Sequence, residues 1–197
     1  HKTCLRPPAT RNIDVLFLID NSPSMAPRQK ALAASFKSFM QKIEATGADY
    51  HVAVATSDVG STVAPGALWG SFGSCDTFAG DDGRLQAIPC TNRPEISPEA
   101  RAACTALCPD PRFVPTGGNY ISRIGGRTNV PSDLVVDPKT GKMVDQGPLR
   151  AFQCLALVGD GGCGIEGQFE GAKRALDGHL VENSGFLRKD SMLAVIF

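Results

Sequence analysis

The chain has 197 residues, 42% of them hydrophobic, and its 20 Lys and Arg residues balance its 20 Asp and Glu residues. This length suits one large domain with a sizeable core, and the lack of a basic excess argues against a nucleic-acid partner. No apolar stretch approaches the roughly 20 residues that a membrane-spanning helix requires, so we expect no transmembrane segment.

The N-terminal part of the chain predicts a strand, a helix and a second strand. Residues 13–20 (IDVLFLID) form a nearly continuous apolar run, which is typical of a strand buried on both faces. In residues 27–45, apolar side chains recur at helical spacing, Pro27 suits the first turn, and Gly47 follows the last turn. Residues 50–58 (YHVAVATSD) predict the second strand.

Residues 59–147 have a different composition, in which Gly, Pro, Ser, Asp and four cysteines dominate. A structureless segment of this length is unusual in a compact domain, so we interpret it as an insertion into a single domain that spans residues 1–197. Within it we expect short strands at residues 84–89 and 119–124 and a short helix at residues 98–108.

Regular structure returns after the middle segment. Residues 148–159 and 165–176 predict helices on either side of a glycine-rich turn, and residues 191–197 (SMLAVIF) predict a third buried strand. Strands that alternate with helices imply crossovers between parallel strands. We therefore expect an α/β fold with a mostly parallel sheet flanked by helices.

The cysteines indicate an oxidising compartment, so we expect the protein to be extracellular, on the cell surface or periplasmic. There are seven: Cys4, Cys75, Cys90, Cys104, Cys108, Cys154 and Cys163. None lies in a C-x-x-C pair and the chain has three histidines, which favours disulfides over a zinc site or free buried thiols. The four in the middle segment are expected to bond among themselves, and we favour the pairing Cys75–Cys90 with Cys104–Cys108.

The first predicted strand ends on a carboxylate, Asp20, and Ser22 and Ser24 follow at alternate positions. In open α/β sheets, ligands bind beyond the carboxyl ends of the strands. This spacing lets a tight loop turn one carboxylate and two hydroxyls toward one point. Such hard oxygen ligands suit Mg²⁺, with Mn²⁺ or Ca²⁺ as alternatives. The simpler interpretation is that Asp20 caps the following helix and the serines satisfy turn amides, and spacing alone does not decide between the two.

Residues 14–25 (DVLFLIDNSPSM) resemble the first strand and metal-ion-dependent adhesion site of a von Willebrand factor A domain, whose D-x-S-x-S motif falls on Asp20, Ser22 and Ser24. The similarity extends to residues 50–60, which resemble the second strand of that family. It also extends to residues 159–176 and 183–197, which resemble a cysteine-containing bacterial branch of it.

The resemblance implies a Rossmann-like, doubly wound fold and a non-enzymatic function. It predicts a metal-dependent adhesion module, secreted or on the bacterial cell surface, in which the bound ion captures an Asp or Glu carboxylate of a protein partner. The cysteine-rich insertion is then expected to shape selectivity.

Three departures from the family pattern concern the metal site. Pro23 stands where the family usually has glycine, and the glycine-rich turn has no threonine, so Asp160 or a water is the expected substitute. The family's last aspartate falls beyond Phe197. We expect the natural chain to continue there and to supply that aspartate and a cysteine that pairs with Cys163. A Cys154–Cys163 bridge is the competing pairing.

Two other functions compete with adhesion. The first is a structural subunit of an envelope or surface assembly in which the metal site is degenerate. The second is a phosphotransferase with Asp20 as nucleophile, although that chemistry commonly needs a second carboxylate at the position of Ser22.

Overall fold

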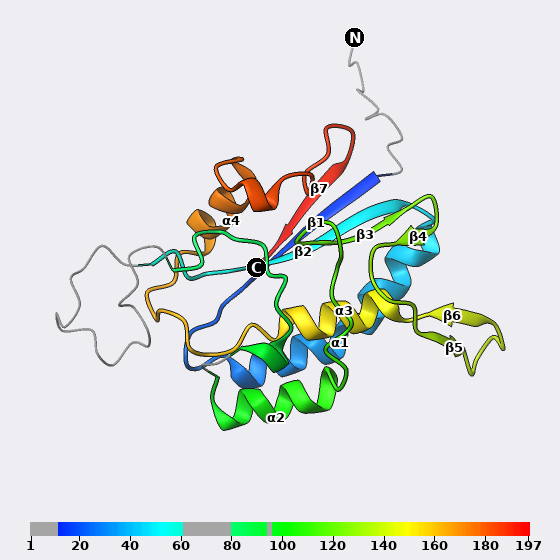
Figure 1. The fold of residues 1–197 in the computed structure, drawn as a ribbon, viewed down its shortest axis with the longest axis horizontal. Coiled ribbons are helices and arrows are strands. Elements are labelled where there is room, and N and C mark those ends of the chain that lie inside the picture. Colours follow the sequence, from blue (N-terminus) through cyan, green and yellow to red (C-terminus); the bar gives the residue numbers. More distant parts are fainter. Residues whose placement is uncertain (1–11, 61–79, 94–95) are drawn as a thin grey trace, which may run out of the picture.

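Five strands form one mixed, mostly parallel sheet in the order β4-β3-β2-β1-β7 (Figure 1). The computed structural model describes residues 12–60, 80–93 and 96–197. β1 pairs in parallel with β2 on one side and with β7 on the other. β3 is antiparallel to β2, and β4 is antiparallel to β3. The strands are β1 (Asn12–Ile19), β2 (Asp49–Thr56), β3 (Ile121–Ile124), β4 (Arg127–Thr128) and β7 (Met192–Ile196).

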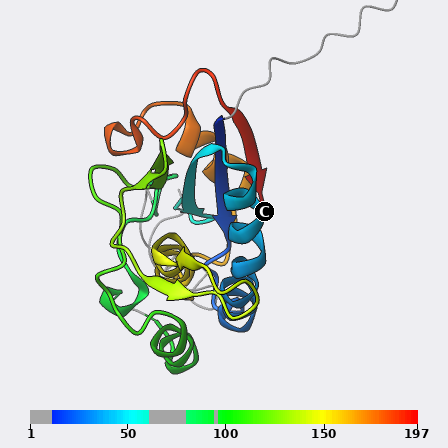
Figure 2. The same ribbon diagram turned by 90° about the vertical axis from the view of Figure 1, so that its right-hand side faces the viewer.

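Helices cover both faces of this sheet, which confirms the predicted α/β class. They are α1 (Ala26–Thr46), α2 (Pro98–Leu107), α3 (Gly147–Ala156) and α4 (Gln168–Leu176), with short 3-10 turns at Cys90–Asn92 and Val181–Asn183. α1 and α3 pack on one face and α4 on the other (Figure 1). Figure 2 shows α2 beyond α1 and α3, on the side away from the sheet. Within the described ranges, no helix is long and apolar enough to cross a bilayer.

The first strand is buried on both faces, as its continuous apolar run predicts. Val15, Phe17 and Ile19 belong to the core beneath α1 and α3, whereas Leu16 and Leu18 belong to the core beneath α4. Because side chains alternate along a strand, an apolar residue at every position supplies both layers. The strand therefore holds the two helical layers together.

The described part of the middle segment contributes β3 and β4 to the main sheet. β3 confirms the strand predicted at residues 119–124, and α2 confirms the short helix. β5 (Leu134–Val136) and β6 (Met143–Asp145) form a separate hairpin. The strand predicted at residues 84–89 is absent. Gln86 donates one backbone hydrogen bond to Val54, and the chain then turns away into the 3-10 turn that begins at Cys90.

Among the described residues, two disulfides crosslink the middle segment, and neither is the pairing favoured from the sequence. Cys90 bonds to Cys104, and Cys108 bonds to Cys154. The Cys104–Cys108 prediction is wrong because α2 ends between them. Cys108 caps the helix with φ −124° and ψ 66°, outside the helical region. Cys154 is therefore not the partner of Cys163, which is itself disulfide-bonded within this chain. Cys75, the fourth cysteine of the predicted set, lies outside the described residues.

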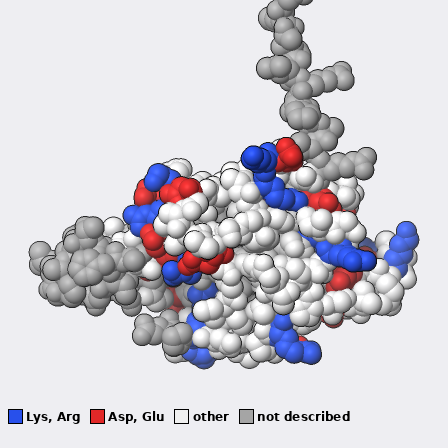
Figure 3. All heavy atoms as spheres, turned by 45° about the horizontal axis from the view of Figure 1, so that its top comes forward, with Lys and Arg blue, Asp and Glu red and all other residues white. Residues whose placement is uncertain are grey.

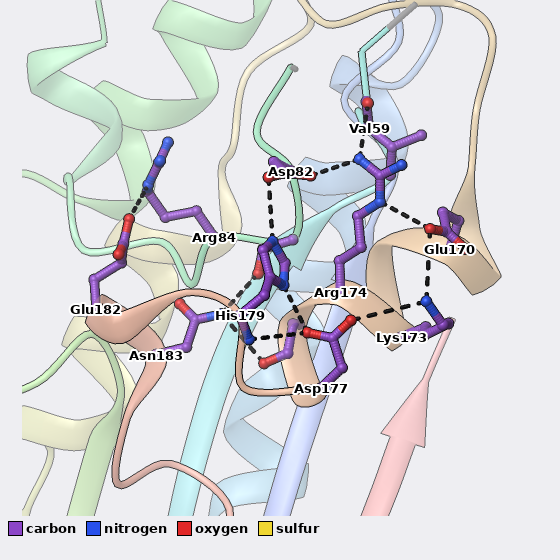
Figure 4. A network of polar contacts seen from close by, with 12 residues as sticks. Val59, Asp82, Arg84, Glu170, Lys173, Arg174, Asp177, His179, Glu182 and Asn183 are labelled. Atoms are coloured by element: carbon purple, nitrogen blue, oxygen red, sulfur yellow. Dashed lines mark hydrogen bonds and ion pairs between the residues drawn. The ribbon is translucent and has the colours of Figure 1, made fainter.

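A network of ion pairs joins α4 to the segment that begins at Gly80 (Figure 4). Arg174 bonds to Asp82 at 2.5 Å. The His179 ring lies between two carboxylates, with Nδ1 2.6 Å from Asp177 and Nε2 3.2 Å from Asp82. A carboxylate only accepts hydrogen bonds, so both ring nitrogens must carry protons to bond both neighbours. The hydrogen bonds to Asp177 and then to Asp82 raise the pKa of His179.

We expect the stability of the protein to depend on pH through His179. A histidine whose folded-state pKa is raised contributes stability that is fully present below its unfolded pKa of about 6.5. That contribution is lost as pH rises through the folded-state value. The check is urea unfolding of the wild type and His179→Gln at several pH values between about 6 and 9. The free energy of unfolding of His179→Gln is subtracted from that of the wild type at each pH. The contributions of the groups present in both proteins then cancel, namely those of His51, Arg174, Lys173, Glu170 and Glu182. A difference independent of pH would contradict the prediction.

Candidate functional site

The candidate site lies at the carboxyl ends of β1 and β2, where three loops meet. β1 ends at Ile19 and leads into Asp20, and β2 ends at Thr56 and leads into Ser57. The third loop, residues 159–163, follows α3 and is hydrogen-bonded to the first: the Gly162 amide donates to the Asn21 carbonyl at 2.9 Å. Polar residues from segments far apart in sequence therefore meet at this edge of the sheet.

Asp20 and Ser22 form the centre of the site. One carboxylate oxygen of Asp20, Oδ1, accepts hydrogen bonds from the Ser22 amide at 2.8 Å and from the Ser57 hydroxyl at 3.3 Å. Ser22 is only 3% exposed, and its hydroxyl oxygen is buried without a hydrogen-bond partner among the described residues. A buried hydroxyl without a partner carries a free-energy cost, so this oxygen is available to bind a ligand.

The two other predicted ligands are placed differently. The Ser24 side chain is exposed. Asp160 is 8% exposed, and its Oδ1 accepts a hydrogen bond from the amide of Ser97, the N-cap of α2, at 2.8 Å. The structure thus brings Asp20 and Ser22 together, whereas at least one oxygen of Asp160 is engaged with α2.

The simpler interpretation of the motif describes part of what Asp20 does. Its carboxylate satisfies a turn amide, that of Ser22, and does not cap α1. The N-cap of α1 is Met25, which makes no side-chain capping bond. The serines do not serve as predicted by that interpretation either, since the Ser22 hydroxyl bonds no described turn amide.

Two residues that follow β2 belong to the site although the motif does not include them. Ser57 is completely buried and bonds to Asp20. Asp58 is 6% exposed and accepts hydrogen bonds from the amides of Gly60 at 2.9 Å and Cys163 at 3.2 Å. The Asp58 carboxylate therefore accepts a bond within its own turn and also ties the β2 loop to the glycine-rich loop. Ser57 and Asp58 directly follow β2, which is parallel to β1, and this position is the sequence feature that could have identified them as site residues.

The glycine-rich loop needs glycine where it approaches the first loop. A Cβ atom on Gly162 would lie 2.3–2.4 Å from the side chain of Asn21, closer than any real contact. Asn21 is 7% exposed, and its Oδ1 also has no partner among the described residues. Substitution of Gly162 would therefore push the two loops apart.

A cavity of about 330 Å³ opens beside Asp20. Its walls are mainly apolar, from Phe17, Ile19, Leu32 and Ile196, with Arg28 and Gln168 as polar members. On the face shown in Figure 3, acidic and basic side chains are interspersed, so this face has no extended field of one sign. Within the cavity wall, the charged side chains are those of Asp20 and Arg28.

The residues present fit a hard cation better than a transition metal. No group of three or more His, Cys, Asp and Glu side chains in the described ranges is arranged to hold a metal ion. The oxygens available are the Asp20 carboxylate, whose Oδ2 has no hydrogen bond in the described structure, and the orphaned hydroxyl of Ser22. One carboxylate with hydroxyl and water oxygens is a donor set that Mg²⁺ accepts.

Comparisons with known proteins do not identify the family. No protein-family model, no curated protein and no solved structure matches the chain. The function therefore has to be argued from the site itself.

Proposed function

We propose that this chain is a non-enzymatic, metal-dependent protein-binding module with the fold of a von Willebrand factor A domain. The observation that carries the proposal is the buried hydroxyl of Ser22, which has no partner among the described residues, beside the carboxylate of Asp20 at the carboxyl end of β1. Asp20 and Ser22 would hold Mg²⁺, or Mn²⁺ or Ca²⁺, with Ser24 or water completing the shell. A cation with a single protein carboxylate keeps positive charge and attracts a carboxylate of a partner.

The topology supports the fold assignment. β1 lies between two parallel neighbours, helices cover both faces, and the D-x-S-x-S motif follows β1 directly. This is the place where open α/β sheets bind ligands. The assignment to a doubly wound, Rossmann-like sheet belongs to the proposal.

The surroundings of Asp20 support binding over catalysis. Its Oδ1 already accepts two hydrogen bonds, and the neighbour two residues on is Ser22, which supplies no second carboxylate for phosphoryl transfer. His51 lies at the opposite end of β2, and His179 bonds Asp177 and Asp82. Neither histidine is placed to act as a base at Asp20.

The crosslinks support a location outside the cytoplasm. Cys90–Cys104 and Cys108–Cys154 are disulfides, and such bonds persist in oxidising compartments. We propose a secreted, cell-surface or periplasmic module, with a partner that presents an acidic side chain.

Calorimetric titration with Mg²⁺ and Mn²⁺ tests the metal site. We expect the wild type to bind and Asp20→Ala to show no binding heat, because the variant lacks the only charged ligand. Asp133→Ala is the matched control, since that aspartate bonds to Arg150 away from the site at 3.1 Å. Circular dichroism establishes that each variant is folded. Undiminished binding by Asp20→Ala would refute the assignment.

One observation favours the second candidate, a structural subunit without a functional metal site. Asp160, the expected substitute for the missing threonine, bonds to the Ser97 amide instead. If the folded wild type binds none of Mg²⁺, Mn²⁺ and Ca²⁺, the scaffold function replaces the adhesion function.

A further inference from the structure

A buried glutamine joins two loops of the candidate site. Gln29, in the first turns of α1, is only 2% exposed. Its Nε2 donates hydrogen bonds to the carbonyl oxygens of Asp20 and Gly159, each at 2.7 Å. Its Oε1 accepts a hydrogen bond from the Gly159 amide at 3.1 Å. One side chain therefore holds the start of the loop that follows β1 and the start of the glycine-rich loop.

Only an amide of this length fits these partners. The side chain must donate two hydrogen bonds and accept one. Because Gln29 is buried, its partners, the carbonyls of Asp20 and Gly159 and the amide of Gly159, are removed from water where they meet it. A carboxylate would offer no proton to the two carbonyls, and an apolar side chain would leave three groups unpaired. Gly159 has φ +88°, a conformation that favours glycine, which places its N–H and C=O within reach of one side chain.

Gln29 occupies a position where the helix would otherwise carry an apolar residue. It falls on the buried stripe of α1 with Ala33, Phe36, Met40 and Ile43. It is the single polar residue among the buried members of that helix. Burial of an amide costs free energy that hydrogen bonds only offset, so packing alone does not account for it.

We propose that Gln29 is the positioning residue of the candidate metal site: it fixes Asp20 relative to the glycine-rich loop and thereby sets the affinity for the cation. The effect on affinity rests on the proposed function, whereas the effect on the loops does not. A metal ligand that is already held in place loses little freedom when the ion binds, and groups that orient ligands typically change metal affinity by about 10–100-fold when removed.

The test compares Gln29→Met with Gln153→Met. Methionine conserves volume in both cases and removes the amide. Gln153 is a matched control because it is also buried, at 8% exposure, and donates to a backbone carbonyl of α1, that of Ala33, at 3.3 Å. It makes no described bond to the site loops. Gln29→Asn is a milder second variant, since its amide is one methylene too short to bridge both loops.

Two measurements are made on each protein: Mg²⁺ affinity by calorimetry, and amide hydrogen exchange of Ser22 and Gly159. We expect Gln29→Met to weaken Mg²⁺ binding by about tenfold or more and to speed exchange at both amides. We expect Gln153→Met to match the wild type in both measurements, even if its melting temperature falls equally. Gln29→Asn should lie between.

The outcomes separate the two proposals. If the wild type binds Mg²⁺ and Gln29→Met binds it as Gln153→Met does, the positioning role is refuted and the metal site stands. If the wild type binds no divalent cation, the proposed function fails. In that case faster exchange at Ser22 in Gln29→Met still supports the positioning of the loop, and unchanged exchange overturns it.

Discussion

Replacement of Asp14 by Asn is expected to lower the free energy of unfolding by about 3–5 kcal/mol, the usual cost of breaking a buried ion pair from one side. Asp14 is completely buried at the start of β1. Its carboxylate accepts hydrogen bonds from Arg188 Nη2 at 2.6 Å, Arg188 Nε at 2.8 Å, the Arg188 amide at 2.8 Å and the Ser191 hydroxyl. The substitution leaves the guanidinium of Arg188, which is 19% exposed, without its counter-charge.

His51 does not replace that counter-charge. Its Nδ1 is 3.7 Å from Asp14 and bonds instead to the Phe186 carbonyl at 2.7 Å. Burial lowers the pKa of His51, so the ring is neutral near pH 7 and the ion pair of Asp14 is with Arg188 alone. Arg188 also donates to the carbonyls of Ile13 and Asp49. The pair therefore joins the starts of β1 and β2 to the turn that leads into β7.

Urea unfolding with the disulfides intact measures this loss. Glu182→Gln provides the control, because Glu182 bonds to Arg84 at the same 2.8 Å but both side chains are about half exposed. Exposed pairs contribute about 0–1 kcal/mol. Equal losses in the two variants would show that burial does not determine the strength of the Asp14 pair.

The elements that the sequence predicts correctly are those whose burial is continuous. β1 and β2 are buried along most of their length, and a run of apolar residues identifies them without knowledge of their partners. β7 is confirmed as a strand, but the burial predicted for it is wrong, because it lies at the edge of the sheet and Met192 and Leu193 are 58% and 39% exposed. α1 is equally clear because its buried residues recur at helical spacing and Gly47 ends it in the left-handed region with φ +65°. The local pattern of apolar residues and the capping glycine are therefore enough to predict these elements.

The β5–β6 hairpin was not predicted because its apolar residues do not form a core. Leu134, Val136 and Met143 are 62%, 60% and 58% exposed. Strands of three residues carry too few positions for a period of two to be recognised. Residues 84–89 are the opposite case, in which a strand is predicted but does not form. Their composition is typical of a strand, yet this segment makes one backbone hydrogen bond to β2 and no ladder.

At the candidate site, the sequence predicted the residues of one loop but not how the loops are joined. Asp20 and Ser22 follow from the strand-end motif, whereas Gln29 acts on Gly159 across 130 residues. The same holds for Asp14 and Arg188, which are 174 residues apart. A polar residue on an otherwise buried stripe is a signal in both cases, but only the tertiary structure supplies its partner.

Removal of the Cys108–Cys154 disulfide is expected to have the other large effect on stability. The bond closes a 46-residue separation, and the chain-entropy model gives about 4 kcal/mol for a loop of that length. The Cys90–Cys104 bond closes 14 residues, for which the same model gives about 3 kcal/mol. The two loops do not overlap in sequence, but both bonds hold α2 within one buried cluster, so we expect the two losses to be coupled when both bonds are removed.

The position of α2 makes the Cys108–Cys154 crosslink especially important. The buried residues of that helix are Ala100, Ala103 and Cys104, and small side chains remove little apolar area from water. Ala103 and Cys104 pack against Ala33, Cys154 and Leu157 in a minor cluster outside the main core. The helix is therefore held on α1 and α3 largely by its covalent bonds.

Double alanine variants test this argument without leaving free thiols. In urea unfolding, Cys108→Ala/Cys154→Ala should lose about 4 kcal/mol and Cys90→Ala/Cys104→Ala about 3 kcal/mol. Limited proteolysis should cut the first variant near exposed Arg112 sooner than the wild type, because the C-terminal end of α2 is then released from α3. Peptide mapping of the unreduced wild type confirms the pairing beforehand. A loss below about 1 kcal/mol for Cys108→Ala/Cys154→Ala would mean that α2 is held by packing after all, and that the crosslink constrains a chain already ordered in its denatured state.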